Sequence, residues 1–112
     1  MLSDEYRYKI LKELQSNPDL SQRELAKRLG ISLGKTNFCL KALIEKGLVK
    51  AGNFKRSSDK AKYLYLLTPK GIEERMSLTH HFLNRKLQEH DELTSEIEEL
   101  RREITHTSQQ TS

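Results

Sequence analysis

The sequence has little of what a secreted or membrane protein needs. Only one of its 112 residues is a cysteine, Cys39, so no disulfide can form within the chain and a reducing compartment is expected. No run of about 18 apolar residues occurs, so no transmembrane helix is expected. Residues 1–5 are acidic and lack the apolar core of a secretion signal. These absences predict a cytoplasmic protein with no membrane partner.

Groups for catalysis or metal binding are also scarce. The histidines His80, His81, His90 and His106 all lie in the C-terminal third, and no nucleophile with a matching base stands out. His80 and His81 would point about 100° apart on a helix, and no cysteine or carboxylate cluster completes a metal site. The glycines form no phosphate-binding loop. The sequence therefore predicts no enzyme, no cofactor and no bound metal.

Charge is abundant and unevenly placed. Residues 1–71 hold 15 Lys and Arg against 7 Asp and Glu, whereas residues 72–112 hold 5 against 9. Within residues 21–62 the count is 11 against 3. A basic first part attracts polyanions such as nucleic acids, and an acidic second part is repelled by them. On charge alone, an ordinary solvated surface remains the alternative.

Two short helices are predicted at the start of the chain. The first runs from about Ser3, its N-cap, to Ser16, and its apolar stripe consists of Tyr6, Ile10, Leu11 and Leu14. The second is only about eight residues long. It begins at a capping box, Ser21 to Glu24, with a hydrophobic staple between Leu20 and Leu25. It ends at Gly30, which can take the positive φ of a C-terminal cap.

A third helix is expected from Ser32, as N-cap, to about Lys46. Its buried stripe is predicted to be Leu33, Thr36, Leu40, Leu43 and Ile44. The other side carries Gly34, Lys35, Asn37, Phe38 and Lys41. The second and third helices are joined by residues 30–32. Two short helices connected by a three-residue turn with glycine are typical of a helix-turn-helix.

The apolar period then changes from helical to alternating. Residues 48–54 and 63–67 read as two strands, and the polar, basic residues between them form the loop of a hairpin, or wing. Thr68 and Pro69 open a last helix that reaches about Thr105. The predicted fold class is mainly α with a small β-hairpin wing. A winged helix-turn-helix domain covers 1–71, a long coiled-coil-like dimerisation helix covers 72–105, and a flexible tail covers 106–112.

The last helix carries apolar residues at seven-residue spacing, which predicts pairing of two copies of the chain. The residues expected to form the dimer interface are Met76, Leu83, Leu87, Leu93, Ile97, Leu100 and Ile104, of which Leu87 lies beside the seam. The seam is regular from Leu93 onward and less regular before it, where His90 and Lys86 occupy seam positions. His90 reads as a residue that sets register or as a mild pH switch. Whether the helices pair parallel or antiparallel stays open.

Several segments of the sequence resemble a known family. Residues 21–32 (SQRELAKRLGIS), 41–49 (KALIEKGLV) and 66–71 (LLTPKG) are similar to the winged helix of bacterial MarR-type transcription regulators. Residues 32–43 (SLGKTNFCLKAL) resemble the small MarR-like regulators associated with exopolysaccharide gene clusters. The resemblance extends to about residue 104. It implies a regulator of surface-polysaccharide genes, which no residue shows by itself.

The resemblance also carries one departure. Typical MarR proteins have a further N-terminal helix that joins the dimer interface and shapes a pocket for phenolic ligands. Here the first helix begins at Ser3, so we expect that helix to be missing. This argues against a small-molecule inducer pocket of that kind, and the effector stays unknown.

These features together predict binding to double-stranded DNA. The third helix would read base edges in the major groove, with Lys35 suited to guanine and Asn37 to adenine. The wing would lie along the backbone or in the minor groove, and the start of the second helix would hold phosphates. The full predicted set is Gln22, Arg23, Ser32, Lys35, Thr36, Asn37, Lys41, Lys55, Arg56, Lys60 and Lys62. Thr36 is its ambiguous member, because its spacing places it nearer the core.

Two alternatives stay open. The winged helix could serve protein contacts, in an adapter that recruits a partner through its coiled coil. Cys39 could be a redox sensor, although a lone cysteine on a packed helix is more often a small core residue.

Overall fold

The elements of the chain follow the predicted order. The structure, a computed structural model, describes residues 2–54 and 62–111. Its elements are α1 (Asp4–Ser16), α2 (Gln22–Leu29), α3 (Leu33–Glu45), β1 (Val49–Phe54), β2 (Lys62–Leu67) and α4 (Pro69–Thr111). Contacts divide the chain into two units, Met1–Thr79 and His80–Ser112. The predicted fold class, a winged helix-turn-helix followed by a long C-terminal helix, is confirmed.

Local capping signals start the first three helices. The hydroxyl oxygens of Ser3, Ser21 and Ser32 each accept a hydrogen bond from the amide three residues on, at 3.2, 3.1 and 3.1 Å. At α2, the Glu24 carboxylate accepts the Ser21 amide in return, which completes the predicted capping box. Gly30 ends α2 in the left-handed region with φ 68°. Each cap satisfies amides or carbonyls that the helix itself leaves unpaired.

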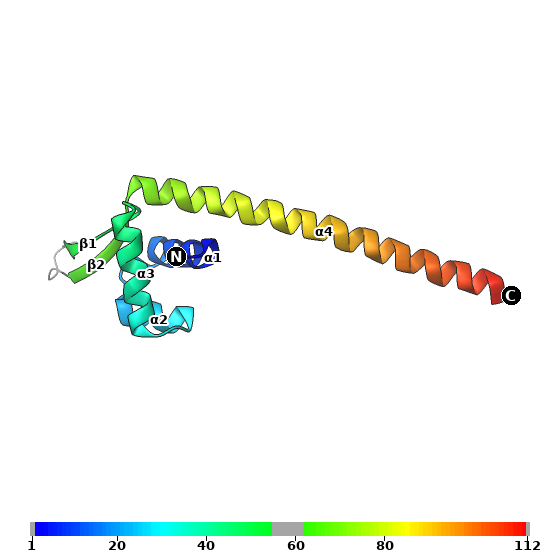
Figure 1. The fold of residues 1–112 in the computed structure, drawn as a ribbon, viewed down its shortest axis with the longest axis horizontal. Helices are drawn as coiled ribbons and strands as arrows, with labels where there is room; N and C mark the ends of the chain where they lie inside the picture. Colours follow the sequence, from blue (N-terminus) through cyan, green and yellow to red (C-terminus); the bar gives the residue numbers. More distant parts are fainter. Residues whose placement is uncertain (1, 55–61, 112) are drawn as a thin grey trace. The chain divides into compact units, whose positions relative to one another are not determined.

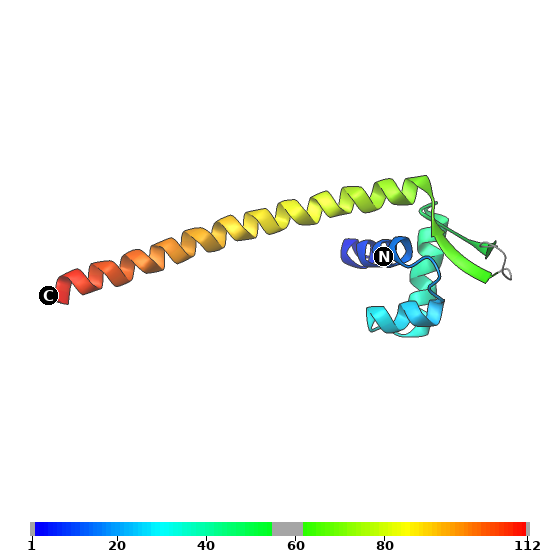
Figure 2. The ribbon, with the colours of Figure 1, turned by 180° about the vertical axis from the view of Figure 1, so that it is seen from behind.

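The first unit has one apolar core. In it, α1 and α3 contact the β1–β2 hairpin, and α2 contacts α1 and α3 (Figures 1 and 2). Its buried apolar side chains are Ile10, Leu11, Leu14, Leu20, Leu25, Ala26, Cys39, Leu40, Leu43, Leu48, Val49, Leu64 and Leu78. Every element of this unit contributes to that set, including the first turns of α4. Burial of this apolar surface is what holds the short helix α2 in place, because an isolated helix of eight residues is marginal.

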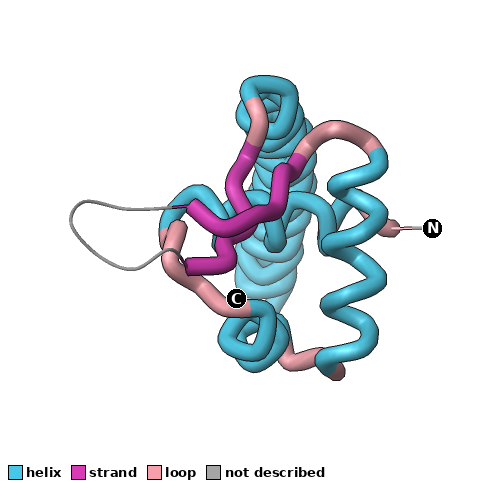
Figure 3. The backbone as a smooth tube through the Cα atoms, turned by 90° about the vertical axis from the view of Figure 1, so that its left-hand side faces the viewer, coloured by secondary structure: helices cyan, strands magenta, loops and turns pink. Residues whose placement is uncertain are grey.

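The hairpin is a two-stranded antiparallel sheet whose strands lie side by side (Figure 3). Val49 pairs with Leu67 at one end, and Phe54 pairs with Lys62 at the other. The hairpin is joined to α4 through Thr68, whose hydroxyl donates to the Gly47 carbonyl at 2.6 Å and accepts the Gly71 amide at 3.0 Å. Thr68 therefore caps α4, as predicted.

Two residues predicted to be buried in α3 are exposed. Leu33 and Ile44 expose 42% and 37% of their surface, and Cys39 is buried in their place. The buried stripe of α3 is Thr36, Cys39, Leu40 and Leu43. Leu33 and Ile44 lie on the flank of this stripe, because residue positions advance by about 100° along a helix. The prediction for these two side chains was wrong.

The second unit, His80–Ser112, is a continuation of α4, which is helical through Thr111. The predicted end at Thr105 was therefore too early. The sequence has no glycine or proline after Gly71, so nothing in residues 72–111 interrupts the helical hydrogen bonds. Among the described residues, no helix is both long and apolar enough to cross a membrane.

Candidate nucleic-acid interface

Most of the residues predicted to read bases are exposed on α3. They are Lys35, Asn37 and Lys41, and Ser32 lies at the start of the helix. Arg23 is exposed in the first turn of α2. The helix-turn-helix thus leaves cationic and amide side chains exposed along α3 and at the start of α2, where they can donate hydrogen bonds to base edges and phosphates.

Thr36 does not belong to this surface. It is fully buried, and its hydroxyl donates to the Ser32 carbonyl at 2.9 Å. A buried hydroxyl that is already hydrogen-bonded within its own helix cannot reach a base edge. The inclusion of Thr36 among the DNA-contacting residues was wrong, because its position at helical spacing from Leu40 and Leu43 puts it in the buried stripe.

Gln22 joins three elements to one another. The Tyr65 hydroxyl of β2 donates to Gln22 Oε1 at 3.1 Å, and Gln22 Nε2 donates to the Leu33 carbonyl at 3.4 Å. Burial, with a smaller contribution from Tyr63, raises the pKa of the Tyr65 phenol, so this hydroxyl stays protonated and remains a donor. Gln22 was predicted to hold phosphates. Its side chain instead ties the wing to the start of α3.

Sequence reasoning did not single out Tyr65 as a functional residue. The available signal was the alternation in residues 63–67, which puts Tyr63 and Tyr65 on the strand face opposite Leu64. Leu64 is buried, Tyr63 is exposed, and the two tyrosine rings meet edge to face with centroids 5.4 Å apart. A phenol on this face is in reach of α2.

Lys35 contacts another element of its own domain. Its Nζ lies 4.6 Å from the centroid of the Tyr6 ring in α1, a cation–π contact. Such contacts contribute about 0.5–1 kcal/mol at exposed sites. The contact is weak enough for Lys35 to exchange it for a guanine edge, and it holds the side chain at the start of α3 in the absence of DNA.

Of the basic residues predicted for the wing, Lys55, Arg56 and Lys60 lie outside the described residues. Lys62 is described through its backbone, which pairs with Phe54 at the end of the hairpin.

Cys39 is a core residue. It is buried on α3, and burial raises the pKa of its thiol, against a smaller lowering by Lys35. A thiol that is both buried and protonated is a poor nucleophile and a poor target for oxidants. The structure therefore favours the packing role for Cys39 over the redox-sensing one.

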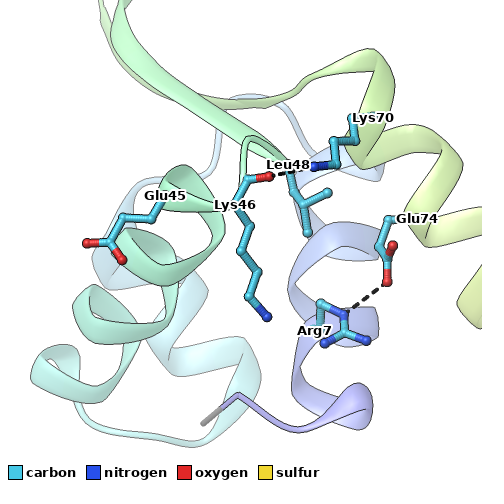
Figure 4. A pocket seen from close by; sticks show the side chains of 6 residues that line it. All are labelled: Arg7, Glu45, Lys46, Leu48, Lys70 and Glu74. Carbon is cyan, nitrogen blue, oxygen red and sulfur yellow. Dashed lines mark hydrogen bonds and ion pairs between the residues drawn. The ribbon is translucent and has the colours of Figure 1, made fainter.

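The first unit also contains an open pocket of about 490 Å³. Arg7, Glu45, Lys46, Leu48, Lys70 and Glu74 line it (Figure 4). Arg7 forms ion pairs with Asp4 at 2.7 Å and Glu74 at 3.2 Å, and Lys70 donates to the Lys46 carbonyl at 3.2 Å. Arg7 and Lys70, two of the three cationic side chains that line the pocket, thus interact with other residues of the chain. These contacts join the first turns of α4 to α1 and to the end of α3.

The predicted seam residues on α4 are all exposed. The exposed fractions of Met76, Leu83, Leu87, Leu93, Ile97, Leu100 and Ile104 range from 41% to 68%. A row of apolar side chains exposed along a helix is the pattern expected of a surface that pairs with another helix.

In residues 2–54 and 62–111, no group of three or more His, Cys, Asp or Glu could hold a metal ion.

Comparison with known proteins shows what the first unit resembles. Residues 3–50 match the family described as winged helix-turn-helix DNA-binding. No curated protein matches the sequence. Several solved structures do match, and the chain spans about half the length of the first of them.

Three of these solved structures are informative. Staphylococcus aureus MarR, solved with salicylate and kanamycin, is 28% identical; the match covers 74% of this chain and 53% of that one, with a TM-score of 0.56. The transcriptional repressor CouR, solved on a 23-mer DNA duplex, is also 28% identical, with coverages of 65% and 50% and a TM-score of 0.55. A MarR/EmrR family regulator from Acinetobacter sp. ADP1 is 24% identical, with coverages of 89% and 75% and a TM-score of 0.62. Residues 3–50 thus resemble a winged helix-turn-helix DNA-binding domain, and the solved structures that share its fold include transcription regulators of the MarR family.

Proposed function

We propose that this chain is a MarR-type transcription regulator that binds specific sequences of double-stranded DNA as a homodimer. The observation that carries the proposal is the set of exposed polar side chains on α3. Lys35, Asn37 and Lys41 are exposed there, on the second helix of a helix-turn-helix. The similarity to CouR, which was solved on a DNA duplex, supports the same conclusion.

In this proposal α3 enters the major groove and its first turns face the base edges. Lys35 donates to guanine O6 or N7, and Asn37 pairs with the adenine edge through its donor and acceptor. Arg23, at the start of α2, contacts a phosphate, where the helix dipole also favours an anion. The wing residues Lys55, Arg56, Lys60 and Lys62 follow the backbone or the minor groove on the outer side.

The homodimer forms through the apolar residues of α4. Two copies of α3 related by a two-fold axis read the two halves of an inverted repeat. Within this arrangement Gln22 and Tyr65 act as positioning residues, because their hydrogen bonds connect the wing with the start of α3. The regulated genes are those of surface or exopolysaccharide synthesis, on the strength of the resemblance of residues 32–43, and the site of action is the cytoplasm.

The test is selection of duplexes from a random library with the full chain, followed by binding measurements on the selected duplex. The variant Lys35→Ala with Asn37→Ala should lose the preference for this duplex over random DNA. A matched control is Lys9→Ala with Lys12→Ala, which removes two lysines from α1. Retained preference in the α3 variant would refute the proposal.

The second candidate function is a protein adapter. The exposed apolar row on α4 favours it, since such a row can pair with a helix of another protein as well as with itself. An adapter would select no duplex sequence, and its DNA binding would not respond to the changes at Lys35 and Asn37. The same experiment therefore separates the two functions.

A further inference from the structure

One large apolar side chain lies in the middle of the proposed DNA-reading surface. Phe38 exposes 63% of its surface, more than any other large apolar side chain described in the first unit. Lys41 and Asn37 are its exposed neighbours on α3. A single exposed apolar residue is common and shows little by itself. Its position among cations on this helix is what calls for an explanation.

A second feature of the same surface is a helical position without a side chain. Gly34 precedes Phe38 by one turn, and the two point about 40° apart around the helix axis. Gly34 is exposed, its φ is not in the left-handed region, and a Cβ built there would meet nothing within 4 Å. Neither backbone conformation nor packing therefore requires glycine. Glycine is less favourable than alanine in a helix, so this residue lowers helix stability without a gain inside the domain.

Gly34 and Phe38 together form a notch beside a ring on the outward side of α3. The notch lets another surface approach the helix backbone closely. The ring offers apolar contact beside it, and Lys41 and Lys35 supply positive charge on the flanks. A major groove that displays a thymine has the matching features. Its phosphates are negative, and the 5-methyl group of the base is the apolar group on the groove floor.

We propose that the Phe38 ring contacts the 5-methyl group of a thymine in each half-site, and that Gly34 allows α3 to approach closely enough for this contact. The proposal rests on the proposed function and adds one base to what α3 reads. The alternative occupant is an apolar pocket on a protein partner. The isolation of the ring and the cations around it favour DNA, because protein-binding patches are contiguous and apolar at their centre.

The test uses the duplex selected by the full chain and removes one methyl group at a time. Each thymine is replaced by deoxyuridine, and the dissociation constant is measured by fluorescence anisotropy at fixed salt. For the wild type, one thymine per half-site should stand out, with about fourfold weaker binding when its methyl group is absent. For Phe38→Ala, thymine and uracil duplexes should bind equally, at about the affinity of the wild type for the uracil duplex.

The matched control is Ile44→Ala, which also removes an exposed apolar side chain from α3 but on a different side of the helix. This variant should keep the thymine preference. If Phe38→Ala also keeps it, or if the wild type does not distinguish thymine from uracil at any position, the inference is overturned while the proposed function stands. If the wild type selects no duplex at all, both fall.

Gly34→Ala supplies an independent test, because thermal stability and DNA affinity should not fall together. Because the position is helical and open, the variant should melt at the same or a higher temperature than the wild type. It should nevertheless bind the thymine duplex more weakly and show a smaller ratio between thymine and uracil. Undiminished affinity and ratio in Gly34→Ala would overturn the role assigned to the notch.

Discussion

Replacing Ile97 and Leu100 by aspartate should turn the proposed homodimer into a monomer. The two side chains expose 41% and 57% of their surface in the single chain, so each has about half of its surface left to bury against a partner. Full burial of such a side chain contributes about 1.5–3 kcal/mol. Half of that is about 1 kcal/mol for each side chain, or about 4 kcal/mol for the four side chains of two copies. The loss corresponds to a weakening of about a thousandfold in the dimer dissociation constant, before any cost of burying the new carboxylates.

Sedimentation velocity measures the effect directly. The wild type should sediment as a dimer and the double variant as a monomer at micromolar concentration. A matched control places aspartate on the opposite side of the same helix, with Ser95→Asp and Arg102→Asp, and should remain a dimer. Circular dichroism of each variant checks that the helix is retained.

If the Ile97 and Leu100 variant sediments as the wild type does, these two side chains do not hold a dimer together. Self-association would then lie elsewhere, and the exposed residues from Met76 to Leu87 would be the next candidates. A wild type that is monomeric at all accessible concentrations would remove the homodimer from the account altogether.

The remaining predictions concern single side chains of the first unit. Asn37→Ala should cost about 1–3 kcal/mol on the selected duplex and less on random DNA, whereas equal losses on both would make Asn37 a phosphate contact. Arg23→Ala should weaken binding to all duplexes alike. It should also lower by about one the slope of the logarithm of the binding constant against the logarithm of the salt concentration, as measured by titration at several salt concentrations. Tyr65→Phe removes the hydrogen bond between the wing and α2, so the free energy of unfolding should fall by about 1 kcal/mol and DNA affinity should fall for every sequence. Tyr63→Phe, at an exposed position, should change neither quantity. Cys39 should react with iodoacetamide at neutral pH only when the protein is unfolded by urea; rapid labelling of the native protein would restore the redox-sensing interpretation.

The parts of the fold that could be predicted are those whose causes are local in sequence. The boundaries of α2 follow from Ser21, Glu24 and Gly30, all within ten positions of one another. Capping bonds and a left-handed glycine need no distant partner, so residue types at fixed spacing are enough to indicate them. The wing was predictable for a similar reason, since alternation in residues 63–67 reflects one buried strand face.

What sequence reasoning missed depends on contacts between distant residues. The hydrogen bond between Gln22 and Tyr65 joins positions 43 apart in sequence, and no local pattern indicates it. The exposure of Leu33 and Ile44 depends on how wide a strip of α3 the core covers, which hydrophobic spacing alone does not give. The end of α4 lies beyond the predicted one because polar composition alone does not end a helix, and residues 106–111 contain no residue that breaks one.

The most direct test of the central claim is a footprint of the full chain on its selected duplex. A two-fold dimer with two copies of α3 on one face of DNA should protect an inverted repeat of about two turns, with half-sites about 10 base pairs apart from centre to centre. The Ile97 and Leu100 aspartate variant should protect the same sequence only at much higher concentration. Protection of a single, unrepeated half-site by the wild type would contradict the account of a dimer that reads DNA through paired α3 helices.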